Sequence, residues 1–230
     1  MNAEKLIPLQ TGDKTVQIFC AHKSAPLVVY HAVRGEGKKL WNACEKAGCP
    51  DFSLAVINGV NWDDEMTPWP IPPISENDTP CTGGADAYLS RLTDEIMPQI
   101  VSALPSAPEY CALAGYSLAG LFAVYAAYKT DWFSRLASGS GSLWYPEFVQ
   151  FATKNRISEE ISVAHFSLGD EESHTGNPYL DSVEDNTRYI VSLFSGKGIR
   201  TALYMNRGNH YQNQAERMAA GIRWILEQTP

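Results

Sequence analysis

The chain has 230 residues, of which 44% are hydrophobic and 19% are charged, and its formal net charge is −8. A chain of this length and composition can bury a sizeable core, and we expect a single domain over residues 1–230, with residues 1–14 as an N-terminal extension. The negative charge gives no electrostatic basis for binding nucleic acid or an anionic membrane, so neither partner is expected.

The five cysteines are scattered, and no two have the C-x-x-C spacing of a metal or redox motif. Several lie in apolar segments, which is typical of buried thiols in a reducing compartment. The first residues form no apolar targeting segment, and no apolar run is long enough to span a membrane. We therefore expect a cytoplasmic protein, and homo-oligomer formation is compatible with the sequence.

Strands and helices are predicted to alternate along most of the chain. Alternating or continuous apolar runs predict strands over 15–20, 26–30, 52–57, 110–114, 133–137, 161–168 and 201–204. Helical spacing of apolar residues predicts helices over 37–48, 86–104, 180–194 and 218–226, one directly after residue 117, and one after Pro146. Pro98 should kink the second of these helices. This alternation predicts an α/β fold with a mostly parallel sheet covered on both faces.

Residues 59–84 interrupt the alternation. The segment contains Trp62, Trp69 and several prolines and acidic residues without a clear period. It follows a strand, so it should lie at the carboxyl ends of the strands, where such sheets bind ligands. A long loop of this kind either forms a wall of the substrate pocket or packs as a surface loop. We favour the pocket wall, because binding residues concentrate on such loops.

Residues 115–120 read G-Y-S-L-A-G between an apolar strand and a helix of small and apolar residues. Small residues around a serine allow a tight strand-to-helix turn that exposes its hydroxyl, the nucleophile elbow usually written G-x-S-x-G. Ala119 replaces the second glycine, and Gly120 follows it. Ser117 is therefore the predicted nucleophile. The alternative is a serine that only caps the helix.

A serine nucleophile needs a histidine base, and the chain has five histidines. His210 follows the last strand by a few residues and precedes the final helix, which is the chain order of α/β-hydrolases. The other four, His22, His31, His165 and His174, lack this placement, and His31 is expected to hold a loop. The histidine needs an acid in turn, and Asp170, Glu171 and Glu172 stand together after a strand.

Three segments resemble the putative-esterase branch of the α/β-hydrolase superfamily, which includes enterobactin-type siderophore esterases and esterase D-like enzymes. They are G-Y-S-L-A-G at 115–120, S-L-G-D-E-E at 167–172 and G-N-H-Y at 208–211, and the resemblance extends over about residues 15–228. In this superfamily the acid often stands three residues after a glycine at the strand end. The resemblance thus selects Glu172 as the acid, with Asp170 as runner-up, and a Ser-His dyad is an alternative.

The oxyanion of the reaction requires two N–H donors. One should be the amide of Leu118, directly after the nucleophile at a helix N-terminus. The other is expected in the loop after residues 27–30, at Ala32 or its neighbour Val33, since His31-Ala32 stands where many family members have His-Gly. The candidate residues for the substrate pocket are aromatic: Trp62, Trp69, Tyr116 and Trp144.

The sequence predicts a serine hydrolase that cleaves carboxylic esters on an α/β-hydrolase fold without a large cap. The short segment between residues 133 and 161 leaves no room for a helical cap, so the site should be open and suit small or polar esters. No zinc ligand set or nucleotide-binding loop is present, and no cofactor or metal is expected. The alternatives are a siderophore or lactone esterase, an acyltransferase with the same triad, and a non-catalytic binding module.

Overall fold

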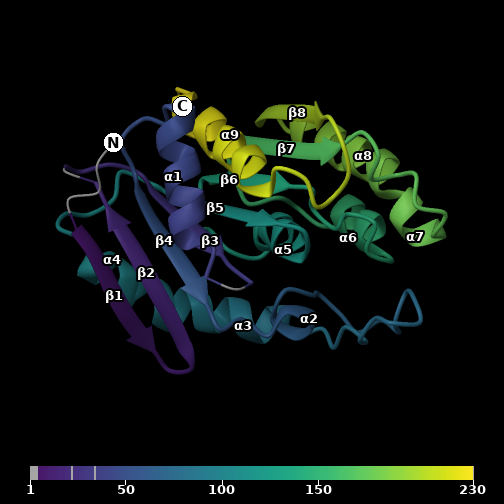
Figure 1. Cartoon of the computed structure of the whole chain (residues 1–230), viewed down its shortest axis with the longest axis horizontal. Coiled ribbons are helices and arrows are strands. Elements are labelled where there is room, and N and C mark those ends of the chain that lie inside the picture. Colours follow the sequence, from purple (N-terminus) through teal and green to yellow (C-terminus); the bar gives the residue numbers. More distant parts are fainter. Residues whose placement is uncertain (1–4, 22, 34, 230) are drawn as a thin grey trace.

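The computed structural model describes residues 5–21, 23–33 and 35–229, and all of its regular structure is organised around one eight-stranded sheet (Figure 1). The strand order is β1-β2-β4-β3-β5-β6-β7-β8. The strands are β1 (Lys5–Thr11), β2 (Lys14–Cys20), β3 (Leu27–His31), β4 (Ser53–Asn58), β5 (Cys111–Tyr116), β6 (Arg135–Gly139), β7 (Val163–Gly169) and β8 (Arg200–Asn206). β2 pairs antiparallel with both β1 and β4, whereas β4, β3 and β5 to β8 are mutually parallel.

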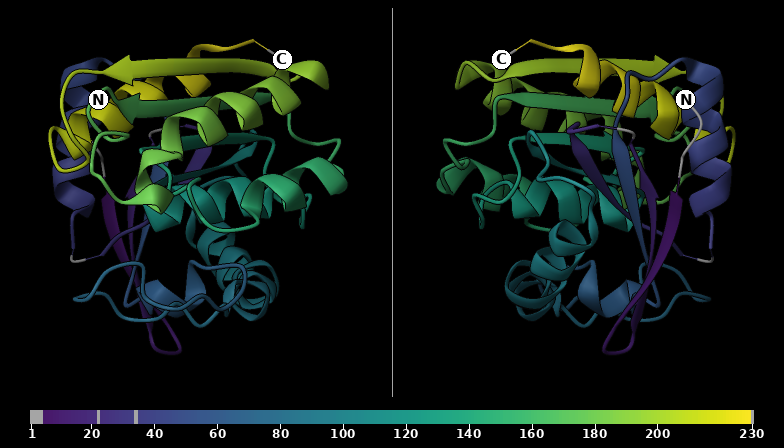
Figure 2. Two further views of the ribbon diagram at one scale, coloured as in Figure 1. Left: turned by 90° about the vertical axis from the view of Figure 1, so that its right-hand side faces the viewer. Right: turned by 90° about the vertical axis from the view of Figure 1, so that its left-hand side faces the viewer.

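Helices cover both faces of this sheet, as the alternation predicts. α1 (Gly37–Ala47) and α9 (Gln214–Glu227) pack together on one face. The other face carries α3 (Ala85–Arg91), α4 (Met97–Ala103), α5 (Leu118–Ala126), α6 (Phe148–Lys154) and α8 (Val183–Gly196). The views in Figure 2 show both helical layers and the twist of the sheet between β1 and β8. α2 (Trp62–Glu65) and α7 (Pro178–Asp181) are single turns in the connecting segments.

The described part of the predicted N-terminal extension contains a strand that the sequence analysis did not predict. Residues 5–11, assigned from the sequence to an extension, form the edge strand β1 with Lys5 opposite Cys20. Pro8 lies in this strand, where the missing N–H is tolerated because one side of an edge strand has no ladder to complete. Within the extension, residues 5–11 are therefore an additional strand, and Lys14 already begins β2.

The predicted kink at Pro98 takes the form of a π-helical turn. Residues 92–96 form η1, between α3 and α4, and the amide of Met97 donates to the carbonyl of Leu92, five residues back. This wider turn accommodates a proline that cannot donate to the carbonyl four residues earlier. The helix continues through the turn, and both Leu92 and Met97 are fully buried.

Two histidines outside the active site are buried in the core. His31 is fully buried, with Nε2 at 2.9 Å from the Tyr88 hydroxyl of α3, so it joins β3 to this helix, and its expected role in holding the following loop stays a prediction. His165 stacks on Tyr204. Burial, together with nearby Lys14, lowers the pKa of His31 to about 3, and burial lowers the pKa of His165 to about 4. Both rings are therefore neutral in the native protein near pH 7.

These buried rings predict a loss of stability in acid. An unfolded histidine binds a proton below a pKa of about 6.5, so the free energy of unfolding falls as the pH drops from there toward the folded values. Each histidine should lower the free energy of unfolding by about 2 kcal/mol at pH 5 relative to pH 7.5. Urea unfolding of wild type and of His165→Gln at both pH values measures this fall in stability. Between pH 7.5 and pH 5, the free energy of unfolding should fall by about 2 kcal/mol less in the variant than in wild type. Equal losses would contradict the prediction.

Candidate active site

The turn from β5 into α5 holds Ser117 in a strained conformation. Ser117 has φ 59° and ψ −126°, a region that non-glycine residues rarely adopt. A Cβ atom on Gly115 would lie 2.1 Å from the carbonyl oxygen of Ala119, and one on Gly120 would lie 2.9 Å from the Cα of Gly141. Only glycine fits at these two positions, whereas Ala119 is accommodated in the core. The segment is the nucleophile elbow that the sequence predicts.

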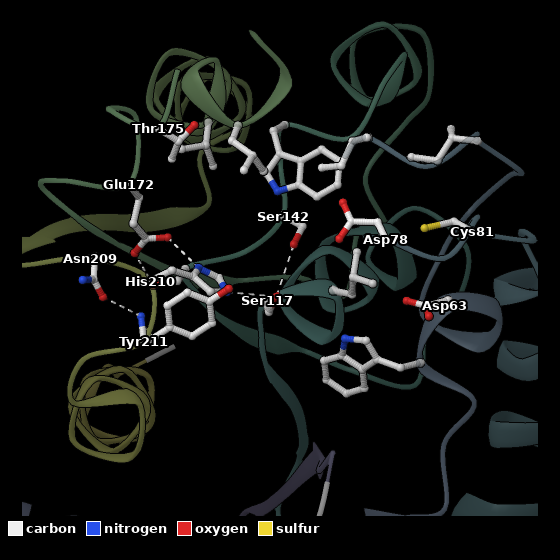
Figure 3. Close-up of a pocket in the computed structure, with 18 of the residues that line it drawn as sticks. Asp63, Asp78, Cys81, Ser117, Ser142, Glu172, Thr175, Asn209, His210 and Tyr211 are labelled. Carbon is white, nitrogen blue, oxygen red and sulfur yellow. Dashed lines mark hydrogen bonds and ion pairs between the residues drawn. The ribbon is translucent and has the colours of Figure 1, made fainter. Parts of the chain in front are cut away.

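Ser117, His210 and Glu172 form a hydrogen-bonded chain (Figure 3). Ser117 Oγ lies 3.1 Å from His210 Nε2, and His210 Nδ1 lies 2.8 Å from Glu172 Oε2. The three residues come from the β5–α5 turn, the β8–α9 loop and the β7–α7 loop, all at the carboxyl edge of the parallel strands. The structure thus brings together the three residues that the sequence selects as nucleophile, base and acid.

Glu172 is buried but is satisfied by several donors. Its Oε1 accepts hydrogen bonds from the Ser140 hydroxyl at 2.6 Å and the Gly169 amide at 2.6 Å. Burial by itself raises the pKa of Glu172, but the hydrogen bonds from His210, Ser140 and Gly169 outweigh it and hold the pKa below its usual value. The ionised carboxylate can only accept, so Nδ1 of His210 carries the proton and Nε2 is left to accept from the Ser117 hydroxyl.

Asp170, the runner-up acid, has a different position. Its Oδ1 accepts a hydrogen bond from the Gly208 amide at 2.7 Å, and its own amide donates to the Asn206 carbonyl. Asp170 therefore ties the loop that carries the acid to the loop that carries His210. Glu171, between the two, is exposed and lines the cavity described below. Of the three adjacent acids, Glu172 alone contacts the histidine ring.

The predicted oxyanion donors have different outcomes. The amide of Leu118 stands at the N-terminus of α5 and makes no hydrogen bond in the described part of the chain, so it remains available. Ala32 is wrong as the second donor, because its amide already donates to the Ile57 carbonyl at 2.9 Å and extends the β3–β4 ladder. Val33, the neighbour considered with Ala32, lines a cavity that Ser117 also lines, and the assignment of its amide as a donor stays a prediction.

Two cavities meet at Ser117. The larger, of about 460 Å³, is lined by part of the 59–84 segment, by Trp144 and by residues of the β7–α8 connection. The smaller, of about 210 Å³, lies toward α1 and includes Tyr30 and Lys39. Ser117, Trp62, His210 and Tyr211 line both cavities. The two spaces provide room for the two sides of a substrate whose reacting carbon lies at the serine.

The aromatic pocket candidates are divided between these cavities and the core. Trp62 and Trp144 line the larger cavity, and the 59–84 segment forms one of its walls, while its contact with substrate stays a prediction. Tyr116 lines the smaller cavity, and its hydroxyl donates to the His210 carbonyl at 2.7 Å. Trp69 lines neither cavity, and its assignment to the pocket is wrong. Its ring packs against Tyr145 and two phenylalanines of α6, and its Nε1 donates to the Pro146 carbonyl, so it anchors the wall from behind.

The structure adds a residue that the sequence reasoning missed. Arg217 of α9 is buried, and its guanidinium lies 3.2 Å from Glu172 Oε1 and donates to the Arg207 carbonyl at 3.0 Å. It therefore contacts both the acid and the loop that precedes His210. A signal was available, since an arginine directly beside Met218 in the apolar stripe of the last helix needs a buried partner.

Replacing Arg217 by methionine should destabilise the protein by about 3–5 kcal/mol, because the substitution leaves Glu172 without its buried cationic partner. The matched control is Arg223→Met on the same helix. Arg223 pairs with Glu227 at the surface, where such a pair contributes about 0–1 kcal/mol. Urea unfolding of both variants measures the difference. Equal small losses would show that Arg217 does not support the acid.

No group of three or more histidine, cysteine and acidic side chains in the described ranges could hold a metal ion. No described helix has the length and apolar character needed to cross a membrane. All five cysteines are buried, and none forms a disulfide among the described residues.

Several solved structures share this fold. The IroE-like serine hydrolase from Shewanella oneidensis superimposes with a TM-score of 0.74 over 97% of this chain and 80% of its own, at 17% identity. The siderophore hydrolase EstA from Aspergillus nidulans superimposes with a TM-score of 0.71 over 96% of this chain and 93% of its own, also at 17% identity. The enterobactin esterase FES from Shigella flexneri gives 0.69 over 96% of this chain and 58% of its own, at 15% identity. At these identities the likeness is one of fold.

Comparisons of sequence give a relative and a family. The uncharacterized protein YbbA of Bacillus subtilis is 24% identical over 194 residues, which cover 81% of this chain and 78% of that protein. The family model described as "Putative esterase" matches residues 44–198, which are more than half of the chain and include both Ser117 and Glu172. The α/β-hydrolase fold and this match agree with the resemblance found in the sequence motifs, and the chain belongs to the putative esterase family.

Proposed function

We propose that the protein is a serine esterase that hydrolyses carboxylic esters through an acyl-enzyme. The observation that carries this proposal is the chain of hydrogen bonds from Glu172 through His210 to Ser117, at an elbow that opens into the larger cavity. Membership in the putative esterase family supports the same chemistry.

In the first half of the proposed reaction, Ser117 Oγ attacks the ester carbonyl as His210 Nε2 takes its proton. Glu172 keeps the proton on Nδ1 and stabilises the imidazolium that forms. The amide of Leu118, aided by the N-terminal end of α5, donates to the oxyanion, and we assign the second donor to the amide of Val33. His210 then protonates the leaving alkoxide, and the alcohol departs.

In the second half, His210 removes a proton from water, and the resulting nucleophile attacks the acyl carbon. Collapse of the second tetrahedral intermediate returns the proton to Ser117 Oγ and releases the carboxylic acid. The described chain carries no long helical insertion over the cavity. This openness supports hydrolysis over acyl transfer, because water has free access to the acyl-enzyme.

Siderophore or lactone hydrolysis is the second candidate for the substrate. It is favoured by the overlap with two solved structures whose names describe a siderophore hydrolase and an enterobactin esterase, over 96% of this chain in each case. A cytoplasmic location belongs to the same proposal, and the five buried cysteines without a disulfide among the described residues support it.

A panel of p-nitrophenyl esters and siderophore lactones tests the proposal, together with labelling by a fluorophosphonate probe. Wild type should hydrolyse members of the panel and take up the probe at Ser117, whereas Ser117→Ala should take up no probe and should lose nearly all of the hydrolysis. Labelling with no hydrolysis, but with acyl transfer to added alcohols, would favour an acyltransferase. Neither labelling nor turnover by the wild type would favour a binding module.

A further inference from the structure

The larger cavity has an unbalanced set of charges. Three acidic side chains other than the catalytic Glu172 line it, and no lysine or arginine among the described residues does. They are Asp63, Asp78 and Glu171. The smaller cavity differs, since Lys39 and Glu36 both line it. The negative charge is thus a property of the larger cavity and is not shared by all the space around Ser117.

The three carboxylates have no cationic partner among the described residues. Asp63 Oδ2 accepts from the Thr79 hydroxyl at 2.5 Å, and Asp78 Oδ2 accepts from the Ser75 hydroxyl at 2.7 Å. These neutral bonds fix the two side chains but leave their charge uncompensated. Elsewhere in the fold the acidic residues Asp13, Glu65 and Glu184 each pair with a lysine or arginine.

The acidic side chains lie around the nucleophile. Figure 3 shows Asp63 and Asp78 across the cavity from His210, with the carboxylate of Asp78 directed toward Ser142 and Ser117. Glu171 adjoins the catalytic acid in the β7–α7 loop. The carboxylates therefore come from two separate segments that both line the larger cavity.

The rest of the lining favours an organic cation over a hydrated metal ion. Trp62 and Trp144 contribute aromatic rings, and aliphatic side chains of the wall and of α8 line the same space. Aromatic faces attract ammonium groups, and apolar walls reward the burial of their alkyl substituents. An anionic group would lose its hydration there and meet three like charges.

We propose that the larger cavity selects esters that carry an ammonium or similar organic cation. This inference rests on the proposed esterase function. The cavity that exposes Ser117 is the binding site, and the three carboxylates determine which charge of substrate it prefers.

Matched esters that differ only in charge test the proposal. One pair places the charge in the acyl group: p-nitrophenyl 4-(trimethylammonio)butanoate and p-nitrophenyl 5,5-dimethylhexanoate. The other places it in the alcohol: butyrylcholine and 3,3-dimethylbutyl butyrate. In at least one pair the cation should have a kcat/KM roughly tenfold higher at low salt, mainly through a lower KM, and about 0.5 M salt should reduce the ratio. Equal values in both pairs, or a neutral preference, would overturn the proposal.

Substitution of the acids locates the effect. Asp63→Asn combined with Asp78→Asn should reduce the ratio of cation to neutral ester to about one third or less of the wild-type value at low salt. Asp51→Asn is the control, because Asp51 is exposed and lies two residues before β4, at the amino ends of the parallel strands, whereas Ser117 lies at their carboxyl ends. Asp51→Asn removes one charge, as Asp63→Asn and Asp78→Asn each do when made singly, and in this control the ratio should be retained. If the ratio fell equally in the cavity variants and in Asp51→Asn, the net charge of the protein would explain the preference, and the proposal would be contradicted.

Binding to Ser117→Ala separates this inference from the proposed function. Calorimetry with butyrylcholine and with 3,3-dimethylbutyl butyrate needs no turnover, and the cation should bind roughly tenfold more tightly at low salt. Tighter binding of the cation, with no hydrolysis by wild type, would retain the cation preference and remove the esterase function. Hydrolysis that depends on Ser117, with equal binding of both esters, would retain the esterase function and remove the cation preference.

Discussion

Replacing Ser117 by alanine should lower kcat for ester hydrolysis by several orders of magnitude and leave the fold intact. The substitution removes only a hydroxyl, and alanine carries the same Cβ as serine in the strained elbow conformation. Without the nucleophile no acyl-enzyme forms, and the remaining advantage over the uncatalysed reaction should be about 10³–10⁴-fold, from binding and the oxyanion donors. Steady-state kinetics on the best ester of the panel, with circular dichroism to check the fold, measures both effects.

Ser142→Ala is the control for this substitution. Ser142 Oγ lies 3.4 Å from Ser117 Oγ in the same cavity, but no hydrogen bond connects it to His210 among the described residues. Its loss should reduce kcat far less. If Ser117→Ala kept more than a few per cent of the activity, or if Ser142→Ala were equally damaging, Ser117 would not be the nucleophile.

The second large effect is expected at the acid. Glu172→Gln should lower kcat by roughly 10³–10⁴-fold with little change in KM. A glutamine amide can donate to Nδ1 of His210, which would place the ring proton on Nε2, where it cannot accept from Ser117. The comparison is Asp170→Asn. Asparagine retains the carbonyl that accepts from the Gly208 amide, so this variant should act on stability more than on kcat.

Kinetics and urea unfolding of both variants distinguish the three possible roles. A large loss of kcat in Asp170→Asn alone would transfer the role of acid to Asp170. Small losses in both would favour a Ser-His dyad, with Glu172 as a structural partner of Arg217.

The elbow could be predicted because its geometry leaves little choice of residue. Gly115 and Gly120 face backbone atoms that a Cβ would meet, so the spacing of small residues around Ser117 encodes the turn itself. The position of His210 could be predicted for a related reason, since parallel strands place the loops that follow them at one edge. Glu172 required the family resemblance, because three acids in a row carry no difference that spacing can show.

Other parts of the site depend on contacts that a single sequence does not contain. Ala32 was assigned from its position after a strand, but whether its amide is available depends on the neighbouring strand, which continues to Ile57 and accepts from it. Trp69 and Trp62 are the same residue type in the same loop, and only packing against α6 directs Trp69 away from the cavity. β1 was missed because an edge strand with a proline and few buried residues lacks the usual pattern.

The larger cavity's wall is tied to the acid loop by the bond from Asn177 Nδ2 to the Ile74 carbonyl at 2.8 Å, but not to the catalytic side chains themselves in the described chain. The Asp170–Gly208 contact and the bond from the Asp170 amide to Asn206 join acid and base loops into one unit. The wall, residues 59–84, is also anchored through Trp69 to the region around Tyr145 and Pro146. No hydrogen bond recorded for the described residues joins the wall to the three catalytic side chains. Exchange of this one contiguous segment therefore offers a route to new substrate ranges, in natural divergence or by loop grafting, with the reaction chemistry inherited unchanged.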